Sequence, residues 1–190
     1  MNLIIEVAFL TVFWAWVVCA ALFLWTTLAP RMPPAATPEQ FHLASTTVRF
    51  SSTDGVLLEG WEIPTDPSRP WLILCHGLGS NRADLLEVAA GLHRLGWNLF
   101  LFDFRAHGGS AGRVTSFGWR EQRDLEGALA FLGAQPDIAP RPYGVYGISM
   151  GAAVALMVAS RDDRIGAVIA DSPYETLHQA ITQHVRGRAG

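Results

Sequence analysis

Two short, uninterrupted apolar runs, residues 71–75 and 97–102, limit the possible folds more than any other part of the sequence. Each run has the length of one strand, and neither alternates with polar residues, as is typical of strands buried on both faces of a parallel sheet. Segments with apolar residues at helical spacing follow at 85–95 and 119–133. Apolar strands that alternate with amphipathic helices predict an α/β fold, a mostly parallel sheet with helices on both faces.

The same alternation continues toward both ends of the chain. We expect a hairpin joined by a tight Asp-Gly turn, then two further strands and two further helices. In chain order these elements cover residues 46–52, 56–63, 142–148, 152–159, 165–170 and about 174–185. Ligands of such sheets bind at the carboxyl ends of the strands. The informative loops are therefore those that follow Cys75, Phe102, Ile148 and Ala170.

The helix expected over residues 119–133 has a regular apolar stripe. The residues expected to face the core are Leu125, Ala128, Leu129 and Leu132. The charged residues of the same segment are expected on its solvent face, namely Arg120, Glu121, Arg123, Asp124 and Glu126.

Residues 7–29 contain no charged side chain, and a helix needs roughly 20 apolar residues to cross a bilayer. The preceding leader has no basic residue and carries Glu6, which argues against a cleaved signal peptide. We therefore expect a single-pass membrane anchor over 1–29, a Pro-rich linker over 30–44 and a globular domain over 45–190. Arg31 flanks the end of the anchor, and the preference of basic residues for the cytoplasm predicts a cytoplasmic domain.

The formal net charge is −3, and no basic stripe suggests a nucleic-acid partner. The two cysteines, Cys19 and Cys75, both lie in apolar segments, and no Cys/His spacing indicates a metal site. The sequence therefore predicts neither a metal nor a cofactor, and it leaves the oligomeric state open.

A nucleophile motif stands where the strand over 142–148 meets a helix rich in small residues. Gly147-Ile148-Ser149-Met150-Gly151 matches the pattern G-x-S-x-G. In a nucleophile elbow, a sharp strand-to-helix turn lifts the serine hydroxyl above the sheet at the helix N-terminus. Bulky residues at the two glycine positions would collide across such a turn. Ser149 is therefore the predicted nucleophile, and the alternative is a helix N-cap serine without chemistry.

Acyl transfer also needs two N–H donors directed at the developing oxyanion. The backbone N–H of Met150, the residue after the nucleophile, is one candidate. The N–H of Leu78, in the loop after the strand at 71–75, is the other, and Gly77 and Gly79 allow the backbone to come close.

These motifs occur in one order and resemble the α/β-hydrolase superfamily, most closely the serine aminopeptidase-like and Bem46-like hydrolases, several of which have an N-terminal membrane segment. The resemblance covers roughly residues 48–177. It rests on residues 75–82, on Asp103-Phe104-Arg105-Ala106-His107-Gly108-Gly109-Ser110, on Thr115-Ser116-Phe117-Gly118 with Glu121 and Asp124, and on residues 146–151.

The resemblance implies roles for the polar residues of these loops. Asp103, Arg105 and His107 are expected to shape the site, with direct substrate contact as the alternative. His76 is expected to fix its loop through hydrogen bonds and not to act as the base, because the base of this architecture follows the nucleophile in chain order.

By the same resemblance, the catalytic acid follows the strand after 165–170 and the histidine lies nearer the C-terminus. The sequence stops at Gly190, so we expect both residues, and two further strands, beyond its end, and we interpret the chain as truncated. Asp171 is a minority candidate for the acid, with capping of the next helix as the alternative. His178 and His184 fall on the last expected helix and are expected on its solvated face, with a role as the base as the alternative.

The predicted function is a serine hydrolase that cleaves an ester, thioester or amide bond of a small-molecule substrate through an acyl-enzyme on Ser149. Two alternatives stay open: an acyltransferase, which shares every motif above, and a catalytically inert, membrane-tethered module.

Overall fold

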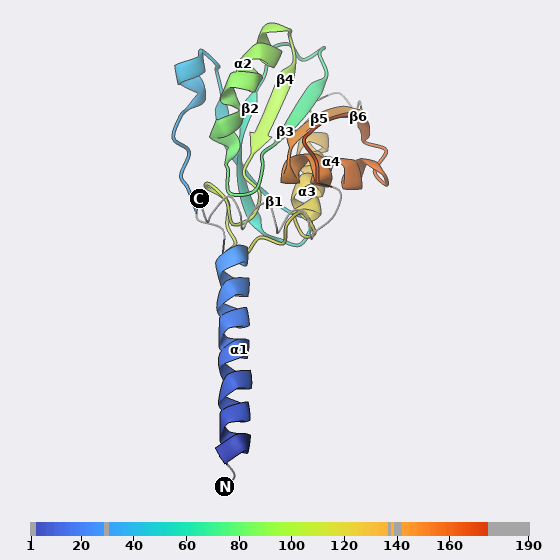
Figure 1. Ribbon diagram of the computed structural model, residues 1–190. Coiled ribbons are helices and arrows are strands. Elements are labelled where there is room, and N and C mark those ends of the chain that lie inside the picture. Colours follow the sequence, from blue (N-terminus) through green and yellow to red (C-terminus); the bar gives the residue numbers. More distant parts are fainter. Residues whose placement is uncertain (1–2, 29–30, 137, 139–141, 175–190) are drawn as a thin grey trace.

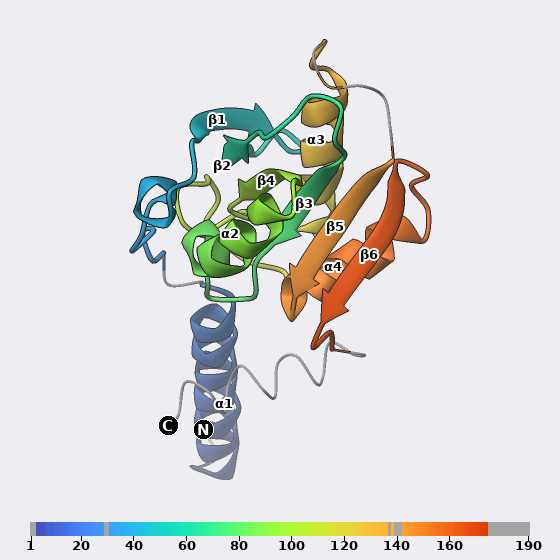
Figure 2. The same cartoon turned by 90° about the horizontal axis from the view of Figure 1, so that it is seen from above.

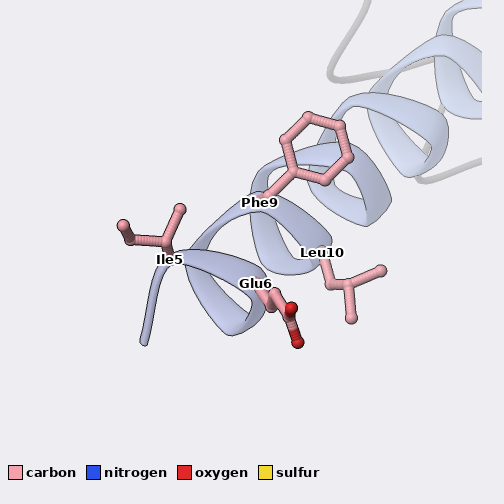
Figure 3. Close-up of a pocket in the computed structure, with 4 residues that line it drawn as sticks. All are labelled: Ile5, Glu6, Phe9 and Leu10. Atoms are coloured by element: carbon pink, nitrogen blue, oxygen red, sulfur yellow. The ribbon is translucent and has the colours of Figure 1, made fainter. Parts of the chain in front are cut away.

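A computed structural model describes residues 3–28, 31–136, 138 and 142–174. Helix α1 (Leu3–Thr27) stands apart from a globular domain that contains the strands of the described residues (Figure 1). Its 25 residues give a length of about 37 Å, enough to cross a hydrocarbon core of about 30 Å. The window Ile5–Leu24 passes this test by length and composition, and none of it is buried. Figure 3 shows side chains near its start, including Phe9 and Leu10, pointing away from the helix axis.

Six strands form one sheet in the order β1-β2-β4-β3-β5-β6. The strands β3, β4, β5 and β6 run parallel to one another, and β1 and β2 form an antiparallel hairpin whose second strand pairs with β4. Their bounds are β1 Thr46–Ser51, β2 Leu57–Ile63, β3 Trp71–Cys75, β4 Asn98–Phe102, β5 Tyr143–Ile148 and β6 Ile165–Asp171. The predicted mostly parallel sheet is confirmed, and each predicted strand lies within two residues of its observed bounds.

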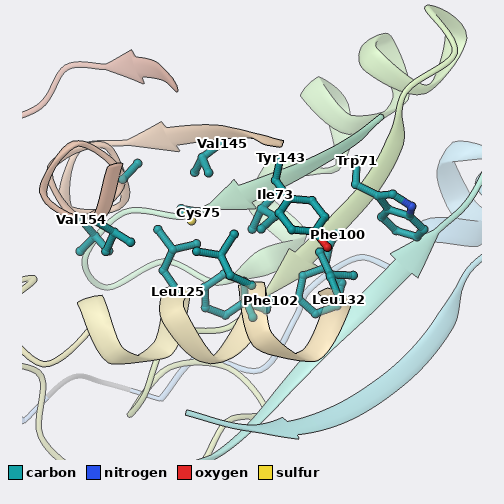
Figure 4. Close-up of a cluster of buried hydrophobic side chains, with 14 of the residues drawn as sticks. Trp71, Ile73, Cys75, Phe100, Phe102, Leu125, Leu132, Tyr143, Val145 and Val154 are labelled. Atoms are coloured by element: carbon teal, nitrogen blue, oxygen red, sulfur yellow. The ribbon is translucent and has the colours of Figure 1, made fainter. Parts of the chain in front are cut away.

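Helices cover both faces of this sheet (Figure 2). The 3-10 turn η2 (Arg82–Leu85) and helix α2 (Leu86–Arg94) pack on one face, and α3 (Gln122–Gly133) and α4 (Met150–Ala159) pack on the other. Alternate residues of one strand feed the two cores, because successive side chains point to opposite faces. In β3, Ile73 joins the core under α3 and α4 (Figure 4), whereas Leu72 joins the core under α2.

The prediction for the polar face of α3 was wrong at two residues. Glu121 and Asp124 are fully buried, although both were expected to face solvent. The spacing explains why: Glu121 lies four residues before Leu125, and Asp124 lies four residues before Ala128, so both fall on the apolar stripe. Their burial indicates that they have partners inside the domain.

Part of the Pro-rich stretch after α1 packs against the domain. A short 3-10 turn, η1 (Pro38–Phe41), interrupts this stretch, and both Pro38 and Leu43 are buried. Leu43 belongs to the core on the α2 side of the sheet. The last expected helix, with His178 and His184, lies outside the described residues.

Candidate active site

Ser149 occupies the turn between β5 and α4 in a strained conformation. Its φ and ψ are 52° and −112°, a combination that residues with a side chain rarely adopt. The position is that of an N-cap, but the hydroxyl makes no capping hydrogen bond, and the side chain is half-buried. The first helical hydrogen bond runs from the Ala153 N–H to the Ser149 carbonyl, so the N–H of Met150 has no acceptor within α4.

Two glycines make this turn possible. A Cβ at Gly147 would lie 2.5 Å from the carbonyl carbon of Gly151 and 2.6 Å from the nitrogen of Ala152. A Cβ at Gly151 would overlap the carbonyl of Cys75 at the end of β3. Backbone atoms cannot move aside as a flexible side chain can, so each position accepts glycine alone without a shift of the turn.

The loop after β3 lies directly beside the serine. A Cβ built on Gly77 would be 3.6 Å from the Cβ of Ser149 and 3.7 Å from the carbonyl oxygen of Ile148. The tertiary structure thus brings together the two segments that the sequence singled out, although about 70 residues separate them.

His76 is buried, and both of its ring nitrogens are engaged. Nε2 accepts a hydrogen bond of 3.0 Å from the Phe104 N–H, so Nδ1 carries the proton and donates to the Gly77 carbonyl at 2.7 Å. Burial lowers the pKa of His76 to about 3. The imidazole is therefore neutral near pH 7 and has no free nitrogen with which to accept a serine proton.

His107 holds the same loop from the other side. Its Nε2 accepts a hydrogen bond of 3.1 Å from the Gly79 N–H, and its Nδ1 donates to the Arg105 carbonyl at 2.8 Å. Burial lowers the pKa of His107 as well, and the two rings lie 5.1 Å apart. Two neutral histidines thus bind the loop after β3 to the loop after β4.

These contacts orient the peptide group that carries the predicted oxyanion donor. The Gly77 carbonyl and the Leu78 N–H belong to one planar trans peptide, so they point in opposite directions. The carbonyl faces His76 and also accepts a bond of 3.3 Å from the Ser80 N–H. The Leu78 N–H therefore points away from the His76 ring.

Asp103 anchors the loop after β4 to the start of η2. Its carboxylate accepts hydrogen bonds from the Arg82 N–H at 2.7 Å, the Arg82 guanidinium at 2.5 Å and the Gly109 N–H at 2.7 Å. Arg82 also pairs with Glu59 of β2 at 2.6 Å. Burial raises the pKa of the Asp103 carboxyl above its ordinary value, and Arg82 opposes that rise.

Arg105 makes a second buried ion pair, and its main partner was missed from the sequence. Its guanidinium lies 2.7 Å from Asp124 of α3 and 2.6 Å from Asp54 of the hairpin turn. Arg105 holds the pKa of Asp54 well below its ordinary range. The helical spacing of Asp124 from Ala128, taken together with the need of Arg105 for a buried carboxylate, was the signal that could have found this contact.

Residues 115–121 close the site on the α4 side. The Glu121 carboxylate accepts hydrogen bonds from the Thr115 hydroxyl, the Ser116 hydroxyl and the Gly118 N–H at 2.7–2.9 Å. The Thr115 hydroxyl lies 3.9 Å from the sulfur of Met150. Glu121 therefore holds this segment against the residue that follows Ser149.

Asp171 lies next to Ser149 through its backbone. Its carbonyl accepts a hydrogen bond of 2.8 Å from the Ser149 N–H, whereas its exposed carboxylate accepts one from the Ser172 hydroxyl. Of the histidines in the described part of the chain, only His76 and His107 belong to the loops beside Ser149, and neither has a free ring nitrogen. The described residues therefore contain the predicted nucleophile and its surroundings, but no histidine beside it with a ring nitrogen free to act as a base.

The mostly parallel sheet and the sharp turn at Ser149 are features of the α/β-hydrolase class, and the comparison with known families finds the same class. The family described as alpha/beta hydrolase fold matches residues 70–187, well over half of the chain. The chain belongs to this family.

Among its relatives, protein bem46 of Schizosaccharomyces pombe is 28% identical over 76% of this chain and 50% of its own length. A polyketide transferase, ATR5 of Stachybotrys chlorohalonatus, is 33% identical over 66% of this chain and 43% of its own length. The esterase Pf2001 of Pyrococcus furiosus superposes with a TM-score of 0.76 at 33% identity, covering 84% of this chain and 64% of the esterase. The chain spans about half the length of the curated relatives it matches.

Proposed function

We propose that Ser149 is the nucleophile of a serine hydrolase that acts on esters, thioesters or amides. The observation that carries the proposal is the strained conformation of Ser149 at the β5–α4 turn, beside the loop after β3, where a Cβ built on Gly77 would lie 3.6 Å from the Ser149 Cβ. Strain of this kind costs of order 1–3 kcal/mol and persists where the surrounding structure imposes it. The similarity to an esterase supports ester chemistry in particular.

The proposed reaction begins when the Ser149 oxygen bonds to the substrate carbonyl carbon and the hydroxyl proton passes to a base. The N–H groups of Leu78 and Met150 stabilise the resulting oxyanion. The bond to the leaving group then breaks, and the leaving group takes the proton. Water attacks the acyl-enzyme, releases a carboxylic acid and restores the hydroxyl. We propose that the base and its orienting acid come from the part of the family's length that this chain does not span, with Asp171 as a minority candidate for the acid.

The test is covalent labelling of the full-length protein in detergent micelles with a fluorophosphonate probe, which reacts with activated serines. We expect labelling of the natural protein and none of Ser149→Ala. Ser160→Ala is the matched control, because Ser160 lies at the opposite end of α4 with an exposed hydroxyl. Equal labelling of Ser149→Ala and the natural protein would exclude Ser149 as the nucleophile.

Acyl transfer is the second candidate, and the similarity to a polyketide transferase favours it. The two reactions share the acyl-enzyme and differ in whether water or another nucleophile attacks it. The two reactions are separated by incubating unlabelled natural protein with a thioester donor, with and without an added alcohol acceptor. A transferase yields the new ester at the expense of free acid, whereas a hydrolase yields acid in both cases.

An inert module is the remaining alternative. It predicts a folded protein that no fluorophosphonate labels and that releases no acid from any ester tested. Labelling that depends on Ser149 excludes it.

We also propose that α1 is a single-pass membrane anchor, that residues 30–44 link it to a hydrolase domain beginning at residue 45, and that this domain is cytoplasmic. The length and composition of α1 support the anchor. Arg31 at its C-terminal side supports the orientation. Protease digestion of sealed inside-out membrane vesicles should remove the domain, and digestion of right-side-out vesicles should leave it intact.

A further inference from the structure

The chain touches the catalytic edge of the sheet as soon as it leaves α1. Arg31 follows the last residue of α1 by four positions, and its guanidinium donates a hydrogen bond of 2.7 Å to the Gly112 carbonyl. The Met32 carbonyl accepts one of 3.5 Å from the side-chain amide of Asn81. Asn81 follows β3 and Gly112 follows β4, so both contacts lie at the carboxyl edge that also holds Ser149.

These contacts limit how far the site can stand from the membrane. Four residues of extended chain span at most about 14 Å, so the end of α1 lies within that distance of Arg31 whatever path residues 28–30 take. Figure 1 shows the yellow-green loop after β4 next to the C-terminal end of α1. The Pro-rich stretch itself makes these contacts, through Arg31 and Met32, and farther along the chain Leu43 packs in the core on the α2 side of the domain.

The segment that Arg31 contacts has the composition of a membrane-interface element. Residues 111–120, which we call the interfacial segment, expose Val114 and Trp119, the latter 74% exposed. Arg113 and Arg120 are exposed beside them and pair with no carboxylate in the described part of the chain. Exposed Trp together with Arg is typical of surfaces that lie in the headgroup layer of a bilayer, where Trp is enriched and Arg attracts anionic lipids.

The inner side of the same segment forms part of the site. Thr115 is buried with its hydroxyl 3.9 Å from the Met150 sulfur, and the Phe117 carbonyl accepts a hydrogen bond from the Tyr174 hydroxyl. A Cβ at Gly118 would lie 3.3 Å from a methyl group of Val154 in α4. The interfacial segment therefore has one side against the surroundings of Ser149 and one side exposed near the end of α1.

We infer that the interfacial segment docks on the bilayer that α1 crosses, and that the acyl substrate is a membrane-resident lipid ester that reaches Ser149 from the bilayer surface. The inference rests on the proposed function for the chemistry at Ser149 and on α1 as the anchor. We take the lipid surface as the occupant because the segment that exposes Trp119 contacts the chain at Gly112, where Arg31 binds it only four residues after the end of α1.

Docking is tested without reference to activity. A polarity-sensitive fluorophore is attached at Trp119→Cys in a Cys19→Ala background, with the full-length protein in vesicles of phosphatidylcholine and phosphatidylglycerol. Leu95→Cys is the matched control, because Leu95 is 73% exposed but lies next to the amino end of β4, at the opposite edge of the sheet. Spin-labelled lipids should quench the fluorophore at 119 and leave the one at 95 unquenched. Equal quenching at the two positions, or quenching at neither, would overturn the inference.

The substrate class is tested with two esters and one substitution. Trp119→Ser should lower hydrolysis of a long-chain acylglycerol embedded in the vesicles by roughly tenfold, the loss expected when about 1.4 kcal/mol of interfacial binding is removed. Hydrolysis of a water-soluble acetate ester should stay within about twofold of the natural rate, and Leu95→Ser should change neither rate.

The outcomes separate this inference from the proposed function. An unchanged rate on vesicles, or an equal fall on both esters, would contradict a lipid route to Ser149. Hydrolysis of neither ester by the natural protein would instead contradict the proposed function, while the quenching result would still decide whether the segment lies on the membrane.

Discussion

Two groups of segments flank Ser149, which we call the first and second walls; buried ion pairs stabilise the first, and backbone hydrogen bonds stabilise the second. The first wall consists of the loops after β3 and β4, where the carboxylates of Asp103 and Asp124 are fully buried and paired with arginines. The second wall consists of the ends of β5 and β6, where the bond from the Ser149 N–H to the Asp171 carbonyl joins the strands. In β6, Ile169 is 53% exposed.

The difference indicates what each wall contributes. Side chains from β2, η2, α3 and two loops hold the first wall, so the loop that carries the proposed donor, the Leu78 N–H, is held by contacts within the protein. Backbone geometry defines the second wall, because two glycines and a sharp turn place the serine.

The largest effect is expected from the first wall. Asp124→Ala leaves the Arg105 guanidinium buried beside the partly exposed Asp54 alone, and breaking a buried pair in this way costs about 3–5 kcal/mol. Glu126→Ala, two residues along α3, removes a half-exposed pair with Arg161 and an exposed hydrogen bond from Thr53, and should cost less than about 1 kcal/mol. Urea unfolding of both variants in detergent, followed by circular dichroism, measures the difference. Similar losses would show that the buried pair is not what stabilises this wall.

His76→Gln should cost about 1–3 kcal/mol at pH 7, because the Phe104 N–H or the Gly77 carbonyl loses its buried partner. The folded-state pKa of His76, about 3, lies below the unfolded value near 6.5, so the unfolded chain binds the extra proton as the pH falls. The natural protein therefore loses stability between about pH 6.5 and 3, and the variant lacks this loss.

The stability gap between the natural protein and His76→Gln should consequently shrink by about 2 kcal/mol from pH 7 to pH 5. Comparing the two proteins cancels the contributions of carboxylates that titrate in the same range. Unfolding curves at both pH values provide the measurement, and a gap that widens at pH 5 would mean that His76 is charged in the folded protein.

At the second wall we expect a smaller effect, in which a substitution to glycine raises the free energy of unfolding relative to alanine. Ser149→Gly should be more stable than Ser149→Ala by about 1 kcal/mol, because glycine adopts a φ of 52° without the strain that a Cβ imposes. Both variants lack the hydroxyl, so they differ only in backbone freedom. Thermal unfolding of the pair provides the comparison, and equal stability would argue that the turn holds no strain.

The smallest effect is expected outside both walls. Arg49→Ala removes an ion pair whose arginine is 68% exposed, and Glu59 keeps its bond to Arg82. The free energy of unfolding should change by less than about 0.5 kcal/mol. A loss above 1 kcal/mol would mean that the exposed pair of Arg49 with Glu59 also stabilises the first wall.

The sequence by itself determined the fold class, the order of the strands along the chain, the membrane-length helix and the G-x-S-x-G turn. Each of these depends on local pattern: apolar runs of strand length, helical periodicity, or glycines that flank a serine. The tertiary structure decided which polar residues meet. Asp124 was expected in solvent and pairs with Arg105, and the Phe104 N–H satisfies His76 from 28 residues away.

Such contacts depend on the order in which strands associate, and pairing of β3 with both β4 and β5 is not encoded in any short segment. The nearness of the interfacial segment to the end of α1 has the same origin. Arg31 and Gly112 are 81 residues apart, and only the folded sheet, with both of its relevant loops at one edge, brings them within a hydrogen bond.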